Sequence, residues 1–274
     1  MGQGPREYAN YSSIVFVRRG AYCIHHRGQH SLIDPHALLY FRAGSEYAVS
    51  HPFRCGDDCV EFAYDERMIA KFECEQPRRI ARPPGAAAGI TLRRASPGVI
   101  RNLAILARKA QLGSASGLEV EEVSIALLRL AIGDSGVHVA VNSAANRKIE
   151  MAKNLLLAEP ARKWSLNEIA REVSTSPFHL TRLFRAQTGT PLHRFLLRTR
   201  LAIALDRVLQ GDDNLTGLAH ELGFSSHSHF SAAFRRAFGT TPSETRAAAG
   251  RRVMPRCAGA QAGRLTAIRR RRRA

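Results

Sequence analysis

The 274-residue chain is poor in acidic residues and has no long apolar run. It carries 23 Asp and Glu against 41 Lys and Arg, which gives a formal net charge of +18. No stretch approaches the roughly 18 apolar residues that a membrane-spanning helix needs. The segment Met1 to Ser13 lacks the basic and apolar regions of a signal peptide. We therefore expect a soluble cytoplasmic protein with no membrane partner.

Cysteine is also scarce, and its pattern excludes a disulfide framework. The five cysteines are an odd number at irregular spacing. Cys55 and Cys59 stand close together, with Cys23, Cys74 and His51 as further thiol or imidazole groups that the fold could bring near. Such groups suit zinc or a redox switch, but cysteine is often a small core residue. Both interpretations stay open.

The positive charge is unevenly distributed along the chain. Residues 1–145 carry 17 basic and 14 acidic side chains, residues 146–249 carry 15 and 9, and residues 250–274 carry nine Arg and no acid. A basic C-terminal half indicates a polyanion partner, although a GC-rich genome also favours Arg. We expect the Arg-rich tail, 250–274, to be disordered. It either adds nonspecific DNA affinity or is a solubilising extension.

The first 95 residues have a β pattern. Short β-prone runs alternate with turn residues, which predicts a small β-sandwich or barrel. These runs are Ser13–Val17, Tyr22–Ile24, His36–Phe41, Tyr47–Val49 and Cys59–Phe62.

Helical periodicity begins after this β region. Residues 96–132 predict two amphipathic helices that either pack on the β domain or form a dimer surface. Residues 133–146 are small, polar and aperiodic, and we interpret them as a linker. Residues 147–249 predict an all-helical domain.

This helical domain contains a repeat offset by fifty residues. Phe184 and Phe234, Arg185 and Arg235, and Gly189 and Gly239 each stand fifty positions apart. A repeat of this length is one helical supersecondary unit used twice.

Each copy has the layout of a helix-turn-helix, in which the second helix enters the DNA major groove. In the first copy, Ser165 and Glu168 form a capping box. Ser176 and Pro177 then open the second helix with an N-cap and a proline at N1. In the second copy, Asn214 or Thr216 caps the first helix, and Gly223 is free to take a positive φ angle in the turn.

The outward faces of the second helices predict the DNA contacts. With Leu180, Leu183 and Phe184 inward, Arg182 is left outward, where a guanidinium can bond guanine N7 and O6 together. Phe178 could pack against a thymine methyl group. In the second copy, Arg235 and Arg236 lie further along and suit phosphate.

The segment between the copies predicts one rigid helix. Residues 191–209 would span about 28 Å as a helix, comparable with the roughly 34 Å between major-groove faces one turn apart. Both helix-turn-helix units could therefore lie on one face of the duplex.

The second copy carries the motif of a known family. Residues 223–230, GFSSHSHF, followed by Phe234–Gly239 and Thr241–Ser243, closely resemble the signature of AraC/XylS-type transcription regulators. The resemblance covers about 100 residues, 147–246. It implies a seven-helix domain with two helix-turn-helix units in successive major grooves.

The resemblance also implies DNA contacts, by position. Many family members carry Arg or another polar residue where this chain has Ala232, which removes one expected base contact from the second copy. Together with the outward faces, the DNA-binding candidates are Phe178, His179, Thr181, Arg182, Arg185, Ser226, His227, Ser228, His229, Arg235 and Arg236.

The N-terminal half resembles, less specifically, the cupin-type domain attached to such regulators. Residues 34–52 carry this resemblance, which implies a small effector or a partner subunit. The chain lacks the His-x-His and Glu pattern of metal-binding cupins, and His25 and His26 would point to opposite faces of a strand. We expect no metal, no cofactor and no enzymatic activity.

The sequence thus predicts an α+β protein with a cupin-like domain and an all-α domain containing two helix-turn-helix motifs. We expect a sequence-specific DNA-binding transcription regulator whose partners are double-stranded DNA, RNA polymerase, a small-molecule effector and a second copy in a homodimer. The alternative is a thiol- or metal-responsive regulator that uses the Cys55 and Cys59 region.

Overall fold

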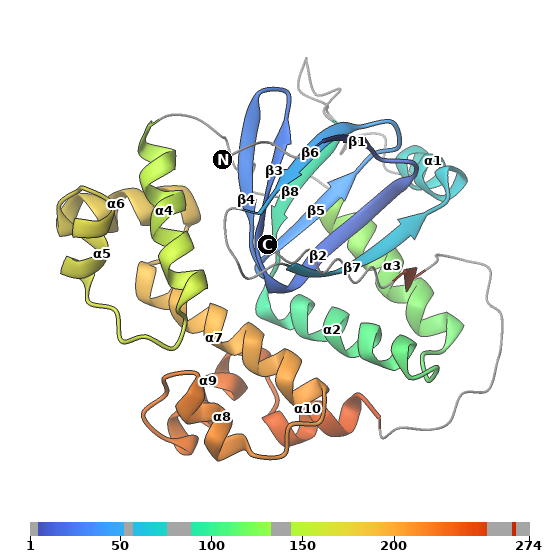
Figure 1. The fold of residues 1–274 in the computed structure, drawn as a ribbon. Helices are drawn as coiled ribbons and strands as arrows, with labels where there is room; N and C mark the ends of the chain where they lie inside the picture. Colours follow the sequence, from blue (N-terminus) through green and yellow to red (C-terminus); the bar gives the residue numbers. More distant parts are fainter. Residues whose placement is uncertain (1–4, 52–56, 76–88, 133–143, 251–264, 267–274) are drawn as a thin grey trace.

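The computed structural model describes residues 5–51, 57–75, 89–132, 144–250 and 265–266. Two antiparallel β-sheets form the N-terminal part, and helices form the C-terminal part (Figure 1). The mixed α and β fold expected from the sequence is confirmed. Across the described ranges, no helix is both long enough and apolar enough to cross a membrane.

The strands are β1 (Arg6–Tyr8), β2 (Ser12–Gly20), β3 (Tyr22–His26), β4 (Gln29–Ile33), β5 (Ala37–Phe41), β6 (Glu46–Ser50), β7 (Asp57–Tyr64), β8 (Ile90–Arg94) and β9 (Leu265–Thr266). One sheet has the order β1-β6-β3-β4 and the other β8-β5-β2-β7-β9. Alternate residues of β2 face opposite sides. Val15 and Val17 pack between the sheets, whereas Ile14 and Phe16 pack toward the helices.

Three features differ from the sequence-based expectation. Helix α1 (Glu66–Glu75) lies inside the segment expected to be β, and helix α4 begins at Ala144, inside the expected linker 133–146. Strand β9 lies in the tail expected to be disordered. It pairs with β7, which would otherwise be the edge strand of its sheet with unpaired backbone groups. Residues 133–143, the rest of the tail and Cys55 lie outside the described residues.

The remaining helices are α2 (Pro97–Gln111), α3 (Gly117–Ile132), α4 (Ala144–Ala158), α5 (Leu166–Glu172), α6 (Pro177–Thr188), α7 (Leu192–Leu209), α8 (Leu215–Glu221), α9 (His227–Phe238) and α10 (Pro242–Ala248). We call α4–α6 the first unit and α8–α10 the second unit. Helix α7 joins the two units (Figure 1).

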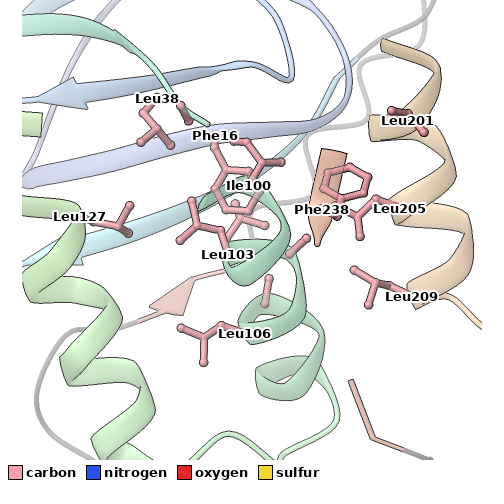
Figure 2. Packing of buried hydrophobic residues seen from close by; sticks show 14 of the residues in the cluster. Phe16, Leu38, Ile100, Leu103, Leu106, Leu127, Leu201, Leu205, Leu209 and Phe238 are labelled. Carbon is pink, nitrogen blue, oxygen red and sulfur yellow. The ribbon is translucent and has the colours of Figure 1, made fainter. Parts of the chain in front are cut away.

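The two units differ in how their cores are built. The first unit has a core of its own, formed around Phe184 and Phe195. The core of the second unit is continuous with the N-terminal part, because α2 contacts both α7 and α9. Figure 2 shows Ile100 of α2 between Phe16 of β2 and Phe238 of α9, and all three are buried. The second unit is therefore fixed to the β-sheets through α2.

Charged groups join β2 to α7 beside this apolar contact. Asp206 of α7 is almost fully buried and pairs with Arg18 at 3.0 Å and with Arg19. Arg19 also donates to the side chain of Gln210 at 2.9 Å. A buried carboxylate with two guanidinium partners fixes the angle at which α7 meets the sheet.

A second buried carboxylate joins the first unit to the β-sheets. Asp34 is fully buried, accepts two bonds of 3.0 Å from Arg94, and lies 3.9 Å from the ammonium of Lys153 in α4. Burial alone would raise the pKa of Asp34, but the charges of Arg94 and Lys153 lower it below its usual range, as does the backbone N–H of His36, which donates to the carboxylate at 2.9 Å. Asp34 therefore stays ionised and holds α4 in place.

Arg200 of α7 joins the two units to each other. Its guanidinium donates to the carbonyls of Pro160 at 2.7 Å, Arg162 at 3.1 Å and Gly223 at 3.0 Å. These carbonyls belong to the loop before α5 and to the turn of the second unit. Gly223 has a φ of 76°, and a Cβ there would lie 2.4 Å from the carbonyl oxygen of Ala161.

Gly223→Ala tests this crowded turn, with Gly189→Ala as its matched control. Gly189 also has a positive φ, 67°, but a Cβ there meets nothing within 4 Å. We expect Gly189→Ala to lower the free energy of unfolding by about 1–2 kcal/mol through backbone strain. Gly223→Ala should cost about 1–3 kcal/mol more, because the Ala161 carbonyl must shift. Urea denaturation measures both, and equal losses would contradict the close contact.

His36 gives a prediction for pH dependence. Burial, with the charges of Arg94, Arg198 and Lys153, lowers the pKa of His36 from 6.5 to about 4, although Asp34 opposes this shift. The folded form keeps His36 neutral, so its stability contribution is complete above pH 6.5. As the pH falls from 6.5 to 4, the unfolded chain takes up a proton that the folded chain does not, and that contribution is lost.

We therefore expect the unfolding free energy of the wild type to fall faster than that of His36→Gln across this interval. The difference should approach about 1.4 kcal/mol per pH unit. Urea denaturation at several pH values measures it, and parallel curves for the two proteins would contradict a buried neutral His36.

Candidate nucleic-acid interface

Helices α6 and α9 begin and end with the same devices. The backbone N–H of His179 donates to the N-cap Ser176 hydroxyl at 3.2 Å, and that of His229 donates to the N-cap Ser226 hydroxyl at 3.1 Å. Both helices run for 12 residues and end at a glycine in the left-handed conformation. These caps define two equivalent helices in the two units.

The first helices of the two units are capped as well. Ser165 and Glu168 form the expected capping box, with the Ser165 N–H donating to Glu168 at 2.8 Å. Of the two residues considered for the second unit, Asn214 is the cap, and its side chain accepts from the Gly217 N–H at 2.8 Å.

The turns show where the two copies differ. Helices α5 and α8 start 49 residues apart, at Leu166 and Leu215, but α6 and α9 start 50 residues apart. The second turn therefore contains one more residue. In the first turn Ser174 takes the positive φ that Gly223 takes in the second.

The outward face of α6 carries all the candidate residues of the first unit. Phe178 is 79% exposed, although it is a large apolar residue on a helix. Thr181, Arg182 and Arg185 are exposed on the same helix, and His179 is half-buried. Arg182 Nη2 lies 3.4 Å from His179 Nδ1, which holds both side chains near the N-terminal half of α6.

The outward face of α9 is organised by serine and histidine pairs. His229 Nδ1 lies 3.0 Å from the Ser225 hydroxyl, and its ring packs edge-on against Phe224. His227 Nε2 lies 3.4 Å from the Ser231 hydroxyl. Both imidazoles and Ser228 are exposed, as is Ala232.

Three further candidates complete this face. Arg235 and Arg236 are exposed in the last turn of α9. Ser226 is half-buried, and its hydroxyl serves as the N-cap of the helix.

Sequence reasoning missed the residues that orient these two faces. Arg200 and Asp206 are charged residues of types that are common on helix surfaces, so no sequence pattern distinguished them. Lys153 did leave a signal: it occupies the apolar face of α4 beside Ile149, Ala152 and Leu156, where a buried lysine needs a carboxylate partner.

Two of the three cysteines in the described part of the chain are buried, and Cys74 is exposed. Cys59, the first residue of the expected β run Cys59–Phe62, lies in strand β7 and is buried. Burial raises the pKa of the Cys23 thiol to about 12, so it is not a thiolate at neutral pH. Among the described residues, no group of three His, Cys, Asp or Glu side chains could hold a metal ion.

Comparisons with known proteins agree with this geometry. A helix-turn-helix domain family matches residues 169–248. The chain is 24% identical over 239 residues to the HTH-type transcriptional regulator ExsA of Pseudomonas aeruginosa, covering 85% of this chain and 76% of that protein. It is 43% identical over 67 residues to the HTH-type transcriptional activator RhaS of Pectobacterium carotovorum, covering 24% of each.

A solved AraC-type regulator from Chromobacterium violaceum is 32% identical, with 39% of this chain and 96% of that chain covered, at a TM-score of 0.37. The family assignment rests on the sequence matches and not on this superposition. The thiol- or metal-responsive alternative is not favoured by the relatives. The chain belongs to the AraC/XylS family and is a bacterial DNA-binding transcription regulator.

Proposed function

We propose that α6 and α9 enter two successive major grooves of one duplex and read its sequence. The observation that carries this proposal is the pair of equally capped helices, each presenting exposed polar and basic side chains on its outward face. The 18 residues of α7 span about 27 Å, which suits units that bind one helical turn apart.

The two helices contribute unequally to specificity in this proposal. On α6, Arg182 can bond a guanine edge and Phe178 can pack on a thymine methyl group. On α9, His227, Ser228 and His229 offer hydrogen bonds, while Ala232 offers none. Arg185, Arg235 and Arg236 bind phosphate and set the register of the protein on DNA.

The N-terminal part, in our proposal, binds a small effector and is not an enzyme. A cavity of about 400 Å³ between the two sheets supports effector binding. Helix α3 supports a homodimer, because Leu118 and Ile125 are exposed seven residues apart on one face. We further propose that the regulator acts at the bacterial chromosome and contacts RNA polymerase there.

Selection of bound sequences from a random DNA pool tests the proposal. Two short motifs centred about one helical turn apart should be enriched by the full chain. A pool that yields no enriched motif would overturn the reading of DNA sequence by α6 and α9.

Arg182→Ala gives a sharper test of the base contact. On the selected site we expect a loss of about 1–3 kcal/mol and a relaxed preference at one base pair. Arg129→Ala is the matched control, because it removes the same charge from an exposed position on α3. Fluorescence titrations on matched and altered sites measure both, and an unchanged preference in Arg182→Ala would refute the assignment.

A further inference from the structure

The space between the two sheets is filled at one end and hollow at the other. Ile24, Ile33 and Leu39 fill the packed end. At the other end lies the cavity of about 400 Å³, which is partly open to solvent. This volume lies within the range of small-molecule sites.

Aromatic side chains form the walls of the cavity. Tyr22 and Phe41 are buried, and the Phe41 ring lies 4.9 Å from that of Tyr47. Tyr8 and Tyr11 are 61% and 39% exposed at the rim. Such walls accept a flat apolar body, and their ring faces attract a cation.

Three carboxylates lie among the polar groups of the cavity. Glu7, Asp57 and Glu61 line it, and none of the described residues that line it is Lys or Arg. The side chain of Asp57 is 5% exposed and contacts His51, while its second oxygen accepts from the Cys59 thiol at 3.0 Å. The described lining thus holds three carboxylates and one imidazole, that of His51.

The acidic lining distinguishes this cavity from a second hollow beside it. A neighbouring hollow of about 610 Å³, lined by β6 and the loops beside it, carries Arg6, Arg27 and Arg42. The two hollows therefore present opposite charge, and an anionic molecule would be favoured only at the basic one.

We propose that the acidic cavity binds a small organic cation, an amine carried on a flat apolar body. The ammonium group pairs with Asp57 and Glu61, and the body packs on Tyr22, Phe41 and Tyr47. This inference rests on the proposed effector-responsive function and names the class of its ligand.

Strand β2 links the cavity to the DNA-binding units. Ser13 and Val15 line the cavity, while Phe16 on the opposite face packs in the core shared with α2 and α9. At the end of the same strand, Arg18 and Arg19 hold Asp206 of α7. A ligand that shifts β2 therefore acts on the helix that joins the two units.

Calorimetric titration of the full chain with three phenyl probes of similar size tests the ligand class. The probes are 2-phenylethylamine, 2-phenylethanol and phenylacetate. We expect saturable binding of the amine, about tenfold tighter than either other probe. Absence of amine binding up to about 1 mM, or equal binding of phenylacetate, would overturn the inference.

Variants locate the site. Asp57→Asn and Glu61→Gln should each weaken amine binding about tenfold, and Glu61→Gln serves if the buried Asp57 variant does not fold. Glu46→Gln is the control, because Glu46 lies in the basic hollow and pairs with Arg6; its amine binding should match the wild type. Unchanged binding in folded Asp57 and Glu61 variants would overturn the site.

DNA selection with the same preparation distinguishes failure of the proposed ligand class from failure of the proposed DNA-binding function. An enriched motif without amine binding refutes the ligand class alone. A failed selection refutes the proposed function, whichever probes bind.

Discussion

The double-sided packing of α2 is the contact on which the arrangement of the molecule depends. One side of α2 packs on the sheet at Phe16, and another packs on α7 and α9 at Leu201 and Phe238. Each fully buried side chain of this size contributes about 1.5–3 kcal/mol. Separating the second unit from the sheets would expose several of them together, so the sheets, α2 and the second unit form one body.

Buried charges fix the geometry within this apolar frame. Asp206 and Asp34 each meet basic partners from another part of the chain, Asp206 from β2 and Asp34 from α4. Apolar side chains tolerate sliding, but a buried carboxylate without its partner costs several kcal/mol. The charges therefore select one orientation of the helical units, while the apolar contacts supply the attraction. Arg200 fixes the orientation of the two units relative to each other, because it donates to backbone carbonyls of both.

Much of the helical part could be predicted from the sequence, because local signals determine it. The capping box at Ser165, the N-caps Ser176 and Ser226, and the left-handed Gly223 all depend on residues within one turn. The strands of the β part were harder to predict from the sequence. Strand β1 is short and mostly exposed, and β8 is placed by its pairing with β5 across fifty residues, so neither has a strong local pattern.

The candidate site was predictable only in part, for the same reason. The outward faces of α6 and α9 follow from helical periodicity, and the structure exposes most of those residues. Arg200, Asp206 and Asp34 act through partners distant in sequence, and periodicity carries no information on such pairs. Lys153 on the apolar face of α4 was the one local sign of a buried ion pair.

The shared core also sets an order of events during synthesis. Helix α2 leaves the ribosome before α7 and α9 exist, and at 5–20 residues per second the 127 residues from Gln111 to Phe238 take roughly 6–25 s. During that interval the side of α2 around Ile100 has no helical partner to cover it. The nascent chain thus exposes an apolar surface of α2 that could bind other apolar surfaces. The second unit buries it later, by packing onto a part of the protein that is already folded. The first unit, with its own core, can fold before that closure.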